Sequence, residues 1–249
     1  MKQLAREIEA NFDAFSASWK TGLETVTQEL DGEQDRYLKS YRRLVSLQAW
    51  RADLLESIIS AESLGFFLEA QNDALVSHVF ARCGSWRSAL KSLRSSVENI
   101  CFCLYYMDHP VELQLWESGK HKPGFTATKD YLLSHPRLAN LDIAITGLQT
   151  VADEYSTLSR AVHASAKSFR MTDDAKTTLL WSSEKPKLGA WETREGHTIT
   201  ALNMLLLSMF REHLQGARLP NLRKSVSFAV PVSKHKAIKD KLGITLSTY

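Results

Sequence analysis

Glycine and proline are scarce in this chain, with eleven glycines and six prolines in 249 residues, whereas average usage of the two together is about 12%. Both residues interrupt helices and supply turns, so their scarcity argues against a turn-rich β-sandwich or β-barrel. The apolar share of 44% and the charged share of 24% are those of an ordinary globular chain, which excludes a disordered polypeptide. The length is that of one large domain or two small ones.

Cysteine is also sparse, and an odd count of three cannot complete a disulfide framework. This count fits a reducing compartment. Cys101 and Cys103 are separated by one residue, which is neither the spacing of a CxxC redox pair nor that of a zinc site. No Glu-x-x-His pattern of a di-iron bundle occurs. We therefore expect no bound metal and no cofactor.

Long apolar runs are absent as well. The longest apolar-rich stretch, residues 199–210, has twelve residues, whereas a bilayer-spanning helix needs about 20. The first residues, Met1-Lys-Gln-Leu-Ala-Arg-Glu7, lack the apolar core of a signal peptide. These absences predict a soluble, cytoplasmic protein without a membrane partner.

The common nucleotide-binding and hydrolase motifs are missing too. Gly119 and Gly124 have the spacing of P-loop glycines, but Phe125 and Thr126 follow them where Lys and Ser or Thr would be needed. The chain contains no GxGxxG, HExxH, GxSxG or EF-hand sequence. Function must therefore be sought outside these motif classes.

What the chain has instead is apolar residues at helical spacing. Residues Leu4, Ile8, Phe12, Phe15, Trp19, Leu23, Val26 and Leu30 recur every three or four positions. This pattern predicts one long amphipathic helix that ends at Asp31-Gly32. Further helices are expected at 34–50, 53–81, 86–107, 111–118, 128–134, 138–146, 149–168 and 197–214. Residues 171–196 have a mixed, polar pattern, and we predict an all-α, helical-bundle fold.

The C-terminal segment differs from the rest in pattern and in charge. Val226, Phe228 and Val230 alternate with smaller residues, which predicts a short strand that could form a β-hairpin with residues 243–249. We divide the chain into an N-terminal helical extension (1–50), a helical body (51–215) and a basic tail (216–249).

The tail carries a net charge of +6 and the rest of the chain −3. Its basic residues are Arg218, Arg223, Lys224, Lys234, Lys236, Lys239 and Lys241. Such a segment could contact the phosphates of a nucleic acid. It could equally be a solvated tail, or it could dock on the acidic body of its own chain.

Two of the expected helices place polar residues on one face. Arg94 and Glu98 are four residues apart, so they share a face. Tyr155, Ser159 and His163 follow at intervals of four. Arg160, three residues before His163, lies on the adjacent turn. Such residues could bind an anion and transfer a proton, because histidine titrates near neutrality. Alternatively, they form a polar network inside the core.

These segments carry a resemblance to a known family. Leu-Arg-Ser-Ser-x-Glu-Asn at 93–99, followed by Tyr-x-x-Leu-Ser-x-x-Val-His-x-Ser at 155–165, resembles an uncharacterised bacterial group of the HEPN superfamily over roughly residues 50–170. The resemblance implies a domain of four to five helices, of a kind common in bacterial toxin and phage-defence systems. Many HEPN proteins are metal-independent RNases. In these, an Arg-x4–6-His motif supplies an arginine that steadies the phosphate and a histidine for acid–base chemistry, usually across a dimer.

This chain departs from the motif, because only two residues separate Arg160 from His163. The resemblance assigns the histidine role to His163 and the arginine role to Arg160 or Arg94, with Glu98, Tyr155 and Ser159 as further candidate catalytic residues. One hypothesis is therefore an RNA-directed toxin or defence component, and possible endoribonuclease, that uses 2′-hydroxyl attack. The alternative is a non-catalytic helical adaptor. It would bind a protein or nucleoprotein partner, and its N-terminal helix would form a homodimer or hetero-complex.

Overall fold

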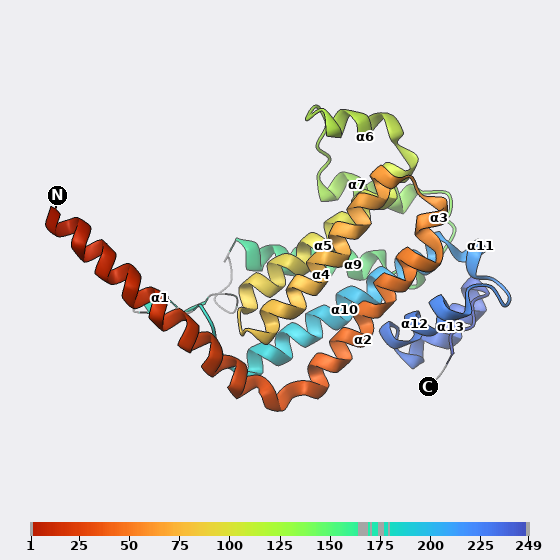
Figure 1. Cartoon of the computed structure of the whole chain (residues 1–249). Coiled ribbons are helices and arrows are strands. Elements are labelled where there is room, and N and C mark those ends of the chain that lie inside the picture. Colours follow the sequence, from red (N-terminus) through yellow and green to blue (C-terminus); the bar gives the residue numbers. More distant parts are fainter. Residues whose placement is uncertain (1, 164–168, 170, 174–176, 179, 248–249) are drawn as a thin grey trace.

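The structure is a computed structural model that describes residues 2–163, 169, 171–173, 177–178 and 180–247. Within these residues the chain is almost entirely α-helical, which confirms the predicted all-α fold (Figure 1). The β structure of the described residues is one antiparallel pair of two-residue strands, β1 (Thr172–Asp173) and β2 (Thr177–Thr178).

The N-terminal helix α1 (Lys2–Leu30) ends at the predicted position, where a 3₁₀ turn, η1 (Asp31–Glu33), leads into α2 (Gln34–Trp50). Figure 1 shows α1 projecting from the bundle as an arm, whereas α2 packs within it. The apolar face of α2 is buried in the core, and Trp50 at its end is fully buried.

The predicted helix over 53–81 is interrupted in the structure. A π-helical turn, η2 (Arg51–Leu55), and the short α3 (Glu56–Ile58) precede α4 (Ala61–Arg82). The new helix begins at Ser60, whose hydroxyl accepts a hydrogen bond from the backbone N–H of Ser63, a standard N-cap. The helix α5 (Trp86–Asp108) then packs along α4, and its predicted apolar stripe is buried.

Shorter helices follow α5: α6 (Pro110–Glu117), α7 (Phe125–Ser134) and α8 (Ile143–Thr146). The next helix, α9 (Leu148–Val162), lies beside α5 and α10. Residues 164–168, where the helix predicted over 149–168 would end, lie outside the described residues.

The central helix α10 (Lys185–Met209) starts twelve residues before the predicted position and is followed by α11 (Arg211–Leu214). Residues 171–196 were predicted to be mixed and polar rather than helical, and this prediction is wrong from residue 185 onwards. The polar residues of this part of α10 pair with neighbouring helices: Glu195 binds Arg43 of α2, and Arg194 binds Glu154 of α9. Residues 198–209 are buried, except Thr200, between α2, α5 and α9.

The predicted strand and hairpin at the C-terminus are wrong. Residues 220–229 form α12 (Pro220–Ala229), and α13 (Val232–Leu242) follows. Leu222, Val226 and Ala229 lie one turn apart and are buried where α12 packs against α2, whereas Phe228 is exposed. Packing on α2 thus selects the helical period over the apparent period of two. Residues 248–249 of the expected hairpin lie outside the described residues.

The apolar residues of the C-terminal segment belong to the same core as those of α2, α4, α5 and α10. Leu222, Ile238 and Leu242 are examples. The division of the chain at 50/51 and 215/216 stays a prediction. Of the helices that the structure describes, none is both long and apolar enough to pass through a membrane.

Candidate functional site

Four of the predicted site residues meet between α5 and α9. The Arg94 guanidinium donates two hydrogen bonds to the Glu98 carboxylate, from Nη1 to Oε2 at 2.8 Å and from Nη2 to Oε1 at 3.0 Å. Its Nε donates to Ser159 Oγ at 3.0 Å, and Nη2 also donates to the Tyr155 hydroxyl. Tyr155 in turn donates to Glu98 Oε1 at 2.8 Å. We call these four residues the Arg94 network.

The guanidinium of Arg94 makes its hydrogen bonds within the Arg94 network. Each nitrogen of the guanidinium has an acceptor within the network, and Ser159 donates to the backbone carbonyl of Tyr155. Phe125 of α7 stacks on the Tyr155 ring with 3.6 Å between centroids. Burial, followed by the nearby Glu98 carboxylate, raises the pKa of Tyr155, so its hydroxyl stays protonated and donates. The network therefore fastens three helices together.

His163 lies apart from the Arg94 network. It follows the last residue of α9, and its side chain is exposed. Among the described residues, the structure gives its imidazole no hydrogen bond or ion pair. Arg160, also exposed, lies on the last turn of α9, with Nη2 3.4 Å from Thr157 Oγ1. The structure thus separates the predicted residues into a closed network and an open helix end.

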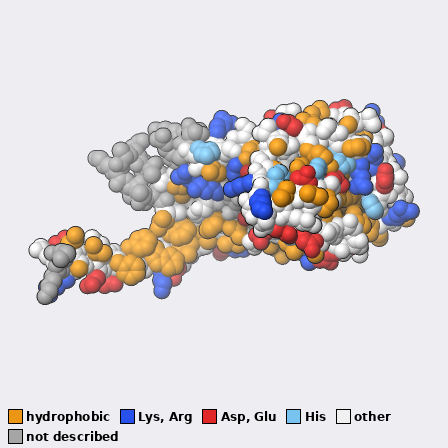
Figure 2. All heavy atoms as spheres, turned by 90° about the horizontal axis from the view of Figure 1, so that it is seen from above, with side chains coloured by type: hydrophobic (Ala, Val, Ile, Leu, Met, Phe, Trp, Pro, Cys, Tyr) orange, Lys and Arg blue, Asp and Glu red, His pale blue; other side chains and the backbone are white. Residues whose placement is uncertain are grey.

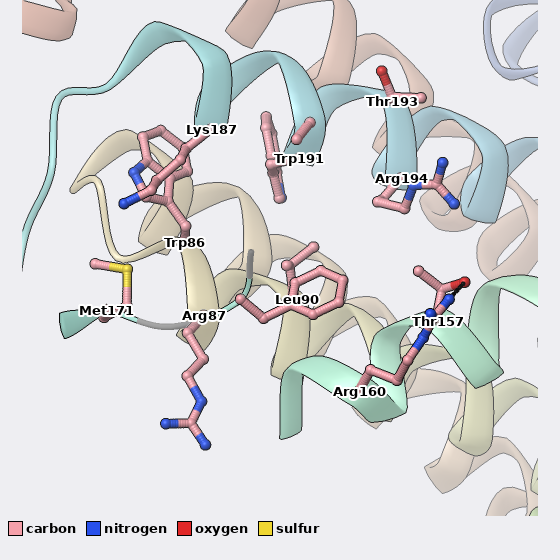
Figure 3. A pocket seen from close by; sticks show the side chains of 12 residues that line it. Trp86, Arg87, Leu90, Thr157, Arg160, Met171, Lys187, Trp191, Thr193 and Arg194 are labelled. Atoms are coloured by element: carbon pink, nitrogen blue, oxygen red, sulfur yellow. Dashed lines mark hydrogen bonds between the residues drawn. The ribbon is translucent and has the colours of Figure 1, made fainter. Parts of the chain in front are cut away.

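A pocket of about 480 Å³ lies beside this helix end, between α5, α9 and α10. Its lining residues are Trp86, Arg87, Leu90, Thr157, Arg160, Phe169, Met171, Lys187, Ala190, Trp191, Thr193 and Arg194. Among the described residues of the lining, four side chains are cationic and none is a carboxylate. Figure 3 shows Lys187 beside Trp86 at one end, Arg160 with Thr157 at the other, and Trp191 and Leu90 between them. The pocket has an apolar middle and a cationic rim.

The cations of the rim are held by neighbouring groups. Arg87 donates from Nε to the carbonyl of Ala161 at 2.9 Å and from Nη2 to that of Val162 at 2.8 Å. These bonds cap the negative end of the α9 dipole, which would otherwise repel an anion.

Two further cations of the rim, Arg194 and Lys187, each bind a carboxylate behind it. Arg194 binds Glu154 Oε1 at 2.9 Å, and Lys187 binds Glu184 Oε1 at 2.5 Å. Glu154 is buried, and it also contacts Nδ1 of His197 at 3.1 Å. Since both carboxylates lie outside the lining, the charged side chains that the described residues add to the pocket surface are cationic.

The predicted nucleic-acid-binding residues lie elsewhere. All seven belong to the segment around α12 and α13, and all but the half-buried Arg223 are exposed. Figure 1 shows these two helices at one end of the bundle, away from the arm α1 and from the start of α10. The structure therefore does not bring the basic segment to the pocket.

Sequence reasoning did not single out the pocket. Its cations come from residues 87, 160, 187 and 194, which are spread over three helices and share no local motif. Among the described residues, no group of three His, Cys, Asp or Glu side chains is placed to hold a metal ion.

Comparisons with known proteins add no family assignment. No protein-family model, curated protein or solved structure matches the chain. The function proposed below rests on the geometry of the helix end and pocket, together with the resemblance of the two motifs.

Proposed function

We propose that this chain is an RNA-directed, HEPN-like component of a bacterial toxin or phage-defence system, with RNase activity at the pocket end of α9. The observation that supports this proposal is the exposed His163 at the end of α9, three residues after Arg160, which lines a pocket with a cationic rim. An acid–base group and a phosphate-binding surface are the two requirements of metal-independent RNA cleavage.

In the proposed reaction, the 2′-hydroxyl of a ribose attacks the adjacent phosphorus and the 5′-oxygen of the next nucleotide leaves. His163 removes the hydroxyl proton or protonates the leaving oxygen. Arg160, on the same turn of α9, and Arg194 stabilise the negative charge that develops on the phosphate. The Arg94 network acts as a positioning device, because it holds the end of α9 against α5.

The direct test is incubation of the full chain with labelled RNA in EDTA. We compare the wild type with His163→Ala and with a matched control, His213→Ala, on α11. We expect products ending in a 2′,3′-cyclic phosphate from the wild type and the control, and no cleavage by His163→Ala. Equal cleavage by all three proteins would remove His163 from the mechanism.

A second candidate function is a non-catalytic adaptor, and α1 favours it. Leu4, Ile8, Phe12 and Phe15 on this arm are exposed by 52–65%, which is typical of an interaction surface rather than of a monomer. In this case RNA or a nucleoprotein partner would be bound through the exposed cations of the basic segment, such as Lys236 and Lys239. RNA that binds but stays intact with every protein above would favour the adaptor.

Charge substitution tests the basic segment better than deletion, since residues 216–249 contribute to the core. We expect Lys236→Glu with Lys239→Glu to weaken RNA binding if these lysines contact phosphates. The plot of log affinity against log salt should become shallower by about 0.7 for each lost contact with single-stranded RNA. An unchanged slope would exclude these two lysines from the RNA site.

A further inference from the structure

The apolar stripe of α1 follows a repeat of eleven residues. The spacing from Leu4 to Leu30 is four, four and three, repeated. Eleven residues in three turns give about 3.67 residues per turn, so the stripe runs almost straight along the helix. The arm has 29 residues and is therefore about 44 Å long at 1.5 Å per residue. Such a stripe fits a second, nearly straight helix lying along it.

Among the described residues, the bundle covers the base of this stripe and leaves its N-terminal half exposed. Leu30 is buried in the bundle, Val26, Leu23 and Trp19 are half-buried, and the four apolar residues nearer the N-terminus are exposed. Figure 2 shows hydrophobic side chains gathered along this arm. This exposure calls for an occupant outside the chain.

The stripe reads nearly the same from both ends. Position 17 is the midpoint of the stripe, and its apolar residues form pairs on either side of this midpoint. Phe12 and Leu23 form the one unequal pair, at five and six residues from position 17. The pairs that lie at equal distances from position 17 are Phe15 and Trp19, Ile8 and Val26, and Leu4 and Leu30. Leu30 is buried in the bundle, so the surface open to a partner runs from Leu4 to the half-buried Val26. A helix with this symmetry can pack against an antiparallel copy of itself, with a two-fold axis at position 17.

The charges beside the stripe match the same arrangement. Asp13 and Lys20 directly follow Phe12 and Trp19 of the stripe and are seven residues apart, two helical turns, so they lie on the same side of it. Their midpoint lies within half a residue of position 17. In an antiparallel pair, Asp13 lies opposite the partner's Lys20, and Lys20 opposite the partner's Asp13. A parallel pair in register places like charges level with each other.

We propose that two copies of this chain form a homodimer through antiparallel packing of their α1 arms, centred on position 17. Each exposed apolar side chain offers about 100 Å², so the four on each arm together bury about 800 Å² in the pair. The half-buried Trp19, Leu23 and Val26 bring the total to on the order of 1,000 Å², the lower limit for a specific interface. The occupant is thus a second copy of the chain. This inference is independent of RNase activity, because it rests on α1 alone.

The first test is sedimentation velocity of the full chain with Phe15→Ser and a matched control, Ala10→Ser, on the opposite face of α1. Phe15 and Ala10 are both exposed, so neither change affects the core. We expect a dimer for the wild type and the control. For Phe15→Ser we expect self-association to weaken about a hundredfold, toward monomer, because each dimer loses two buried phenyl rings. The proposal would be overturned by a monomeric wild type, or by a dimer whose affinity Phe15→Ser does not change.

The second test is a charge swap at low salt, which separates antiparallel from other pairings. Asp13→Lys or Lys20→Asp alone creates two like-charge pairs per dimer and should weaken self-association about tenfold. The double variant Asp13→Lys with Lys20→Asp restores both pairs and should recover the wild-type affinity. Equal parts of the two single variants should form mixed dimers. If the double variant stays as weak as the singles, the antiparallel register is wrong.

Discussion

Replacing Arg94 by methionine tests whether the Arg94 network is structural. The substitution keeps most of the aliphatic stem but removes every hydrogen bond of the guanidinium. Glu98 then keeps only the bond donated by Tyr155, and Ser159 loses the donor at its Oγ. The carboxylate is left poorly compensated in a partly buried site.

The size of the effect follows from burial. The side chains of Arg94 and Glu98 are each 21% exposed. Breaking a fully buried ion pair costs about 3–5 kcal/mol, and an exposed pair contributes at most about 1 kcal/mol. The exposure of this pair places its cost between these two values. We therefore expect Arg94→Met to lower the free energy of unfolding by about 2–3 kcal/mol. For a chain of this size the midpoint of thermal unfolding should fall by about 5–10 °C.

The assay is urea and thermal unfolding followed by circular dichroism, beside RNA cleavage. Lys91→Met is the matched control, because Lys91 is exposed on the same helix and its loss should change stability by less than about 0.5 kcal/mol. If Arg94→Met unfolded like the wild type but no longer cleaved RNA, Arg94 would act on the substrate and the structural interpretation would be refuted.

Three further predictions concern single groups. Burial lowers the pKa of His78 from 6.5 to about 4, so the unfolded chain takes up the proton first. Urea titrations should then show stability falling between pH 6.5 and 4, by up to about 1.4 kcal/mol per pH unit, and His78→Gln should flatten this slope. Gly147→Ala should destabilise the chain well beyond Gly119→Ala in thermal unfolding: both have a φ of +73°, but only at Gly147 would the new Cβ meet a backbone oxygen, at 2.6 Å. Burial raises the pKa of Cys101 and Cys103 to about 12, so a thiol reagent should modify both only after unfolding; rapid labelling of the native chain would contradict this burial.

Helices with an apolar stripe and clear end signals could be predicted from the sequence. The limits predicted for α5, 86–107, differ from the observed helix by one residue, because Gly84 precedes it and Pro110 follows it. The start of α10 was missed for the opposite reason. Its Arg194 and Glu195 read as a polar connection, whereas in the structure they pair with carboxylate and guanidinium groups of α9 and α2. Such pairing is set by tertiary packing and leaves no local pattern.

The same contrast holds for the candidate site. The pairs Arg94–Glu98 and Tyr155–Ser159 are visible because each lies on one helix at a spacing of four. Their meeting depends on the packing of α5 against α9, which the sequence does not encode locally. The pocket is harder still to predict from the sequence, because its cations come from three helices that are far apart in the chain.

The two arginines of α5 fix the position of the C-terminal end of α9. Arg87 and Arg94 are seven residues apart, two turns, so they project from the same face of α5. Arg94 holds Ser159, and Arg87 holds the carbonyls of the last two residues of α9, directly before His163. Two cations of α5 thus fix α9 at two successive points and neutralise its C-terminal dipole. In the proposed function, Arg94 and Glu98 of the Arg-Ser-Ser-x-Glu segment are therefore positioning residues for His163 and do not react with RNA.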